Sequence, residues 1–339
     1  QRCVRFERVP IMNLTYLKEE KMHSLEHAWV ALQKRPYLIV FALGRILFVS
    51  KGTTRMTDEQ KTQLRAVLRE LGLSNAQLKQ ASARGKIRLR GVPTADMARL
   101  VHPNEVTYVP DAPKLTPGRD LAVLFRDKDL AVVWKPSGWL SVKATGRSAD
   151  IDVVSYVAKL FGQSFVVHRL DEETSGVMMV ALNESTQTKI KALLEKHDVE
   201  RKYLALVAGR PGSKAWSMDT KLVRNRGDGL RGSGSGKDAK RAQTHFVVLE
   251  RFASNAALVQ ATLETGRTHQ VRIHLAEAGH PVLGDRLYGN KSSARRSPRV
   301  ALHAAWLGFV HPRSAEKKTF DIPLADDLER LRRDLAMKH

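Results

Sequence analysis

A charged loop lies between two apolar runs in residues 165–180, and it constrains the fold more than any other stretch. Residues 165–167 and 177–180 are apolar, whereas the stretch between them carries one His, one Arg, one Asp, two Glu and then Thr-Ser-Gly. Short apolar runs bounded by turn residues are typical of buried strands, so we expect strand, loop and strand. Arg169 and Asp171 then lie on a loop held at both ends by a sheet. Taken alone, this pair is typical of a salt-bridged surface turn.

The charge of the chain indicates its class of partner. The 339 residues carry a net charge of +22 with a pI of about 10.3, and 42% of them are hydrophobic. The hydrophobic content predicts a folded protein, and the length allows two domains. The excess positive charge favours a nucleic acid over an acidic membrane, because no basic amphipathic anchor is present. The single cysteine, Cys3, excludes an internal disulfide framework and fits a reducing compartment.

The apolar runs of the chain do not predict a membrane protein. The most apolar run, Tyr37 to Val49, contains Arg45 and is too short to span a bilayer. The N-terminus does not resemble a signal peptide, and it begins at Gln1 rather than Met. We therefore expect a cytoplasmic protein that makes no membrane contact, with a mitochondrial protein that has lost its presequence as the alternative.

The N-terminal part predicts a small α/β domain. A capping-box pattern at residues 57–60 predicts a helix that Gly72 ends, and Ser74 with Gln77 predicts a second helix ending near Gly85. Strand-like segments follow at 86–90 and 105–109, and a proline-rich linker at 110–118.

The rest of the chain predicts a sheet with a few covering helices. Asp150 is placed to cap a helix that Gly162 ends, and a second helix is expected at 184–196. The glycine-rich and basic stretch 224–240 predicts a mobile loop. We expect strands at residues 121–125, 130–134, 201–209, 245–250 and 257–263, and a basic amphipathic helix from Ala325 onward.

Residues 265–278 predict a helix that carries charged groups. Thr268 is placed to cap it, and His269 and Arg272, three residues apart, then share a neighbouring face. His269 and His274 could suggest a metal. Their spacing of five does not put two ligands on one helical face, and no Glu or Cys is placed to complete a zinc site, so we expect no metal.

Two of these strings, and one strand, resemble motifs of the RluA-type pseudouridine synthases, RNA enzymes that turn uridine into its carbon-linked isomer. Residues 168–176 resemble the catalytic motif, which implies that Asp171 is the catalytic residue. The resemblance also implies that Arg169, with His168, braces the gap left by a flipped-out nucleotide. Residues 201–209 are similar to the string Lys-x-Tyr-x-Ala-x-Val-x-Gly, whose tyrosine, here Tyr203, stacks on the target uracil.

The second long string is similar to Gly-Arg-Thr-His-Gln-Ile-Arg-x-His, with Val271 in place of Ile. The resemblance implies that an arginine here pairs with the catalytic aspartate. Alignment of the motif favours Arg272, and Arg267 stays the alternative. Arg267 and His269 are then expected to contact RNA. Lys135 opens a Lys-Pro-x-Gly string that resembles another family motif, with an architectural role.

The resemblance implies an α+β fold: a mixed, mostly antiparallel sheet with an RNA cleft at 113–339, and a smaller N-terminal α/β domain at 1–112. Within the latter, residues 73–110 are loosely similar to an RNA-binding domain first seen in a ribosomal protein. Residues 279–289 and 302–312 also match the family, and we interpret them as scaffold.

The activity implied is isomerisation of a uridine in structured RNA by a monomer that needs no cofactor and no metal. We expect rRNA rather than tRNA as the substrate. One alternative is a catalytically idle RNA-binding ribosome-assembly factor of the same fold. A glycoside hydrolase is disfavoured because that chemistry needs two carboxylates at a set separation, and no second motif supplies one.

Overall fold

The computed structural model of the chain describes residues 37–42, 45–50, 61–70, 72–143, 146 and 151–337. The capping-box start predicted at 57–60 and the predicted cap Asp150 lie outside these residues. The first described elements are the strands β1 (Tyr37–Ala42) and β2 (Arg45–Ser50), which pair antiparallel with each other.

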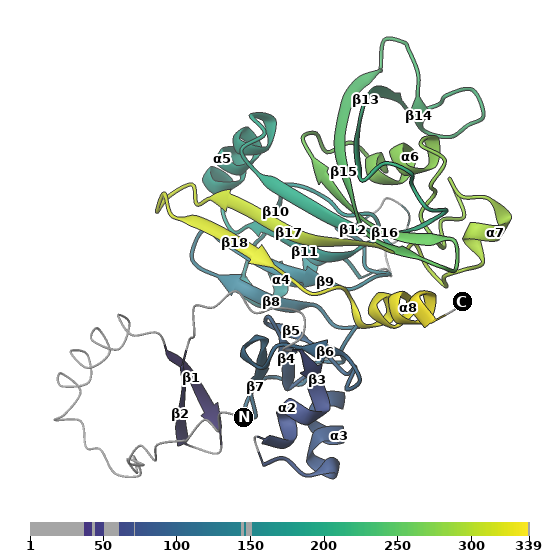
Figure 1. Cartoon of the computed structure of the whole chain (residues 1–339). Coiled ribbons are helices and arrows are strands. Elements are labelled where there is room, and N and C mark those ends of the chain that lie inside the picture. Colours follow the sequence, from purple (N-terminus) through teal and green to yellow (C-terminus); the bar gives the residue numbers. More distant parts are fainter. Residues whose placement is uncertain are drawn as a thin grey trace.

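One large mixed sheet forms the centre of the molecule (Figure 1). Its strands follow the order β14-β13-β15-β16-β12-β17-β11-β9-β8, with β10 on β11 and β18 on β17. All of these pairs are antiparallel except β11 with β17, so the predicted α+β fold with a mixed, mostly antiparallel sheet is confirmed. The strands are β8 (Ala122–Arg126), β9 (Leu130–Lys135), β10 (Phe165–Val166), β11 (Ser175–Ala181), β12 (Glu200–Ala208), β13 (Ala215–Val223), β14 (Gly232–Ser233), β15 (Lys240–Phe252), β16 (Ala256–Leu263), β17 (Leu302–Val310) and β18 (Lys317–Asp321).

The middle of the sheet is buried on both faces. Every residue of β9 and of β11 is buried, which explains why these strands have continuous apolar runs rather than alternation. Gly176 allows the parallel pairing with β17, because its φ is +130° and a Cβ there would lie 2.2 Å from the carbonyl oxygen of Ala304. The strand that follows the charged loop is therefore fixed against its neighbour.

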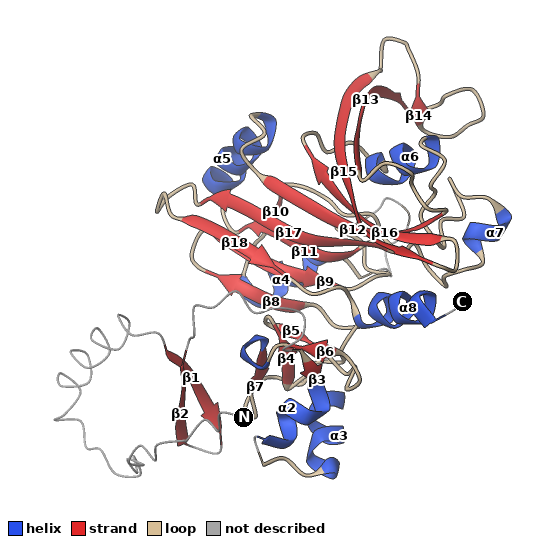
Figure 2. Ribbon diagram, viewed as in Figure 1, coloured by secondary structure: helices blue, strands red, loops and turns tan. Residues whose placement is uncertain are grey.

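Five helices of this region are described. In Figure 2, α4 (Val153–Phe161) lies behind the strands of the sheet, and the other four lie around it: α5 (Glu184–Glu195), α6 (Gln270–Glu277), α7 (Lys291–Ala294) and α8 (Asp326–Met337). The cap of α4 is Asp152, whose carboxylate accepts the N–H of Ser155, and not Asp150 as predicted. Among the helices that the structure describes, none combines the length and apolar character needed to cross a bilayer.

The N-terminal region has a hydrophobic core of its own, built from residues 64–106. The helix α3 begins with the predicted capping box of Ser74 and Gln77, whereas α2 begins only at Leu64, after a short strand. The division into domains 1–112 and 113–339 stays a prediction. The elements are β3 (Thr62–Gln63), α2 (Leu64–Glu70), α3 (Asn75–Ala83), β4 (Ile87–Leu89), β5 (Val92–Pro93), β6 (Leu100–Val101), a 3-10 turn (Pro103–Glu105) and β7 (Val106–Tyr108).

The small region packs on the start of α8 through polar contacts. Asp326 accepts hydrogen bonds from Thr94 Oγ1 and the Ala95 N–H, at 2.7 and 2.8 Å. Arg99, which is buried, donates to the Leu324 carbonyl at 2.7 Å, and Arg333 pairs with Asp96 at 2.8 Å. These contacts join segments more than 220 residues apart in the sequence.

Candidate active site

The loop between β10 and β11 is held from beneath by Lys135, the last residue of β9. Its ammonium is fully buried and donates to the carbonyl oxygens of Pro136, Trp139 and Glu172, at 3.1, 2.7 and 3.0 Å. Burial lowers the pKa of Lys135 to about 7, opposed in part by the charge of Asp171. Lys135 therefore anchors the backbone next to Asp171.

Arg272, on α6, lies at the carboxylate of Asp171. Its Nη1 is 3.3 Å from Asp171 Oδ2, and its other side holds Asp285 in a two-pronged contact at 2.7 and 2.9 Å. Arg267, the alternative partner, is exposed and donates from Nε to the carbonyl oxygen of Arg241 instead. The Asp171 side chain keeps 23% of its surface exposed.

Asp285 is a site residue that the sequence interpretation placed in the scaffold. Its side chain is fully buried and also accepts the N–H groups of Leu287 and Tyr288, at 2.9 and 3.1 Å. Burial raises its pKa, but Arg272 and these N–H groups more than offset that effect and leave it below its ordinary value. The sequence carried no local signal for this role, because Asp285 and Arg272 come together only in the folded structure.

His269 and Tyr288 form the side of the site next to Arg272. His269 Nδ1 is 2.9 Å from the Tyr288 hydroxyl, and its Nε2 is 3.9 Å from Asp171 Oδ1. The Tyr288 ring lies under the Arg272 guanidinium, with its centroid at 5.2 Å. Burial lowers the pKa of His269, opposed by the charge of Asp171. The ring is thus placed as a neutral hydrogen-bonding group.

Tyr203 faces the site from β12, where alternate residues point inward. It is 8% exposed, and burial raises its pKa to about 12, so the phenol is neutral at physiological pH. Arg201, two residues earlier, is buried on the same face. Sequence reasoning did not select Arg201, although period-2 alternation would have placed it beside Tyr203.

His168 and Arg169 differ in their surroundings. His168 Nε2 accepts the N–H of Met179 at 3.1 Å, and burial lowers its pKa to about 3, so the neutral ring fastens the loop to β11. Arg169 is exposed. Its side chain can therefore reach a ligand bound next to Asp171.

All seven predicted site residues line one cleft of about 770 Å³. This volume is within the range of small-ligand sites and suffices for one nucleotide unit. Cations outnumber carboxylates on its wall, so the cleft suits an anionic substrate. The seven residues are His168, Arg169, Asp171, Tyr203, Arg267, His269 and Arg272.

The start of α6 is built differently from the prediction. The residue before the helix is His269, at φ +59°, and it makes no side-chain cap; Thr268 does not cap the helix either. Instead Gln270, buried at the first position, accepts the Arg267 N–H and donates to Gln243 and Thr244 of β15. The amide of Gln270 thus aligns the whole string with the sheet.

The histidines of this string are committed to protein partners. His274 contacts the hydroxyls of Thr244 and Thr220, at 2.9 and 3.1 Å, and His269 contacts Tyr288. They do not converge on a common point that a metal could occupy.

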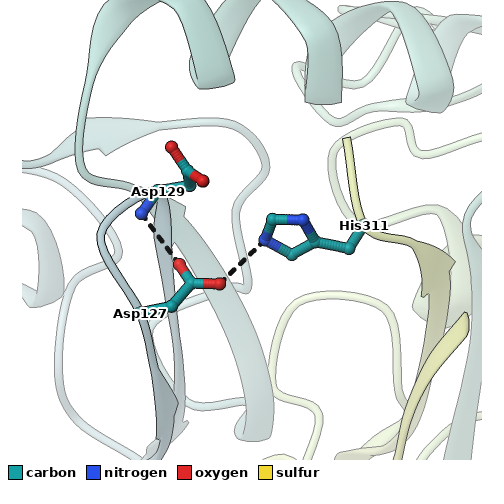
Figure 3. Close-up of side chains that lie close together, drawn as sticks. All are labelled: Asp127, Asp129 and His311. Carbon is teal, nitrogen blue, oxygen red and sulfur yellow. Dashed lines mark hydrogen bonds and ion pairs between the residues drawn. The ribbon is translucent and has the colours of Figure 1, made fainter. Parts of the chain in front are cut away.

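Another group of possible metal ligands lies at the β8–β9 turn (Figure 3). Asp127, Asp129 and His311 bring one ligand atom each within 4.8 Å of one another. His311 Nδ1 accepts the N–H groups of Arg313 and Ser314, which leaves the proton on Nε2, 2.9 Å from Asp127. Asp129 pairs with Arg313 at 2.6 Å. We assign this group to the structure of the turn.

Comparison with known proteins gives one consistent family. The RNA pseudouridylate synthase family matches residues 129–277. The dual-specificity RNA pseudouridine synthase RluA of Salmonella typhimurium is 34% identical over 203 residues, which cover 60% of this chain and 93% of that protein. The ribosomal large subunit pseudouridine synthase D of Zymomonas mobilis is 35% identical over 231 residues, covering 62% of this chain and 71% of that protein.

A solved structure agrees. Human RNA pseudouridylate synthase domain containing 1 shares 26% identity, covers 66% of this chain and 98% of its own, and superposes with a TM-score of 0.52. The match in sequence, the shared sheet and the cleft that joins both long motifs have one explanation. The chain belongs to the RluA-type pseudouridine synthases, a family of RNA-modifying isomerases.

Proposed function

We propose that this enzyme isomerises a specific uridine of a structured RNA, with Asp171 as the nucleophile. The observation that carries the proposal is the placement of the Asp171 carboxylate. One oxygen lies 3.3 Å from Arg272, while the side chain stays partly exposed in a cleft it shares with Tyr203. The guanidinium of an arginine fixes the direction of the carboxylate that it contacts.

The reaction needs no atom from outside the substrate. Asp171 forms a covalent bond to the uridine, at the base or at the sugar, and the bond from ribose C1′ to uracil N1 breaks. The uracil turns in the cleft and forms a bond from C5 to C1′. A carboxylate bound to C1′ is displaced as this bond forms, whereas one bound to the base is released afterwards. The C5 proton then leaves and N1 takes up a proton. Neutral Tyr203 would stack on the uracil while it turns, and base stacking of this kind contributes about 1–3 kcal/mol.

The target nucleotide would have to leave its helix. A uracil stacked in a duplex cannot place its C1′ and C5 atoms against a carboxylate inside a cleft, so flipping is required. Arg169 supports this step, because it is exposed at the cleft and sits two residues from Asp171 on an anchored loop.

We propose rRNA rather than tRNA as the substrate and a monomer as the active form. The name of the Zymomonas relative refers to the large ribosomal subunit, and that of the Salmonella relative to dual specificity. The proposed compartment is the cytoplasm, because a chain with a single cysteine fits a reducing environment. Mapping pseudouridine in total RNA from cells with and without the protein would identify the RNA.

The Asp171→Asn variant tests the nucleophile. Asn keeps the size of the side chain and removes its charge, so pseudouridine formation on the mapped RNA should stop. RNA affinity should change by no more than a few fold, because most binding comes from phosphate contacts and stacking elsewhere. The measurement pairs an isomerisation assay with a binding titration of the same proteins.

Two results would contradict the proposal. An Asn variant that turns over at the wild-type rate would reduce Asp171 to a salt-bridged turn residue. A wild-type protein that binds RNA tightly but forms no pseudouridine on any cellular RNA would instead favour the ribosome-assembly factor.

A further inference from the structure

Arg201 is a buried cation that forms no ion pair with a carboxylate within the described part of the chain; the nearest carboxylate charge that acts on it is that of Glu264. Its side chain lies on the inner face of β12 beside Tyr203 and lines the cleft. Only 8% of it is exposed, its Nε has no hydrogen-bond partner, and Nη2 reaches the Glu264 carbonyl oxygen at 3.4 Å. The Glu264 carboxylate lies 3.5 Å from His245 instead. Burying a charge without a partner is costly, so such a group indicates a missing anion.

Gly266, which is exposed, is the backbone neighbour of Arg201. Gly266 lies directly against the guanidinium, since a Cβ there would be 2.6 Å from Arg201 Nη1. Gly266 also belongs to the walls of two cavities, the catalytic cleft and a smaller side pocket of about 300 Å³. Arg201 therefore lies near the junction of the two.

The side pocket is strongly basic. Its only acid is Asp238, which accepts the backbone N–H of Arg224, and none of its five cations makes an ion pair with a described carboxylate. Three of these cations come from residues 224–240, which the sequence predicted as a mobile loop. Their loop is tied to α6 by two hydrogen bonds from Ser233 to Glu277. The five cations are Arg169, Arg224, Arg231, Lys240 and Arg267.

We propose that Arg201 binds a phosphate of the RNA backbone next to the flipped uridine, and that the strand continues from there through the side pocket. An unpaired guanidinium suits the two-pronged contact of a phosphodiester. The five cations of the side pocket suit a chain of repeated negative charges rather than a single small anion. The inference rests on the proposed function for the identity of the ligand.

The experiment uses the full chain and a labelled RNA hairpin whose loop is made of uridines. Arg201→Gln should weaken binding about tenfold or more, because it removes a charge-assisted contact. Arg201→Lys should lose less, because it keeps the charge without the fork. The control is Lys202→Gln: Lys202 is the next residue, points to the other face and pairs with Glu200, so affinity should stay within twofold.

A set of hairpins, each with one loop phosphate replaced by a neutral methylphosphonate, locates the contact. One modified hairpin should bind the wild type more weakly than the unmodified hairpin does. The same modification should not change the affinity of Arg201→Gln any further. Thermal unfolding supplies a second readout, since loss of an unpaired buried charge should leave the melting temperature unchanged or higher. A structural arginine would give the opposite result.

The outcomes separate the two proposals. Equal affinities for Arg201→Gln and Lys202→Gln, or additive losses at every phosphate, would overturn the phosphate site even if pseudouridine forms. A coupled phosphate in a protein that modifies no RNA would overturn the proposed activity and leave the phosphate site standing.

Discussion

Arg272 divides its guanidinium between two carboxylates that differ in burial. Asp285 is fully buried and holds two of its nitrogens, whereas Asp171 is partly exposed and receives one contact at 3.3 Å. The geometry assigns different tasks to the two acids. Asp285 fixes the position of the arginine through two hydrogen bonds. The arginine is then oriented toward Asp171 and makes one contact with it.

Replacing each acid by its amide should therefore give unequal effects on stability. Asp285→Asn leaves Arg272 without its main partner in a buried site, which costs about 3–5 kcal/mol. Asp171→Asn leaves the Arg272–Asp285 pair intact, and its cost should stay below about 1 kcal/mol. Urea denaturation of both variants measures the difference, and equal losses would contradict it.

Lys135 should make stability depend on pH. Its pKa is about 7 in the folded protein against 10.5 for a free lysine, so between these values the unfolded chain binds the extra proton. The free energy of unfolding should then rise with pH in this window, by up to about 1.4 kcal/mol per unit. Lys135→Met cannot titrate and lacks this contribution. The difference between the two proteins, measured by urea denaturation from pH 7 to 10, isolates it.

The contrary outcome is also informative. Three carbonyl oxygens surround the Lys135 ammonium and favour its charged form. Parallel stability curves for wild type and Lys135→Met would show that they outweigh burial.

At the scale of elements, the helix α8 reaches the active-site loop through one residue. Arg299 holds Asp327 of α8 at 2.7 and 2.9 Å. The same guanidinium donates to the Glu173 carbonyl and to Ser175 Oγ, both at 3.1 Å. The start of α8 also carries Asp326, which binds the N-terminal region. The start of α8 is thus linked both to the active-site loop and to the N-terminal region.

Arg299→Lys should lower the isomerisation rate at saturating RNA about tenfold, because Lys cannot hold the loop and α8 together with a fork. RNA affinity should change little. Arg332→Lys is the matched control, because Arg332 pairs with Glu329 and Glu250 instead of the loop. Single-turnover kinetics of both variants provide the measurement, and equal rates would exclude the role of Arg299.

The elements themselves were largely predictable, because their signals are local. The strand, loop and strand around Asp171, and the capping box at Ser74, follow from periodicity and turn chemistry. The start of α6 did not, because the side chain of Gln270 satisfies the backbone through tertiary contacts with β15. The role of Asp285 could not be predicted either, because nothing in its sequence neighbourhood indicates that it pairs with Arg272.

At the scale of the whole molecule, the net charge of +22 should dominate RNA affinity. Each contacted phosphate of a single strand should contribute a decrease of about 0.7 in log K per unit of log salt concentration. Titrations of the labelled hairpin at several potassium chloride concentrations measure the slope. A salt-insensitive affinity would contradict RNA binding by phosphate contacts.

The arrangement of the N-terminal region on α8 could not be predicted from the sequence. Its contacts pair Thr94 with Asp326 and Asp96 with Arg333, across more than 230 residues. Isolated polar residues leave no periodic pattern, and their partners are known only once the fold is built.

The contact between Asp171 and Arg272 joins residues 101 positions apart, and this separation has a consequence for folding kinetics. Hairpins such as β15–β16 can close early because their strands are adjacent in the chain, whereas the active site must wait for the closure of a long loop. During refolding from urea, secondary structure should therefore return before isomerase activity. A newly made chain would contain most of its sheet for some time before it could modify any RNA.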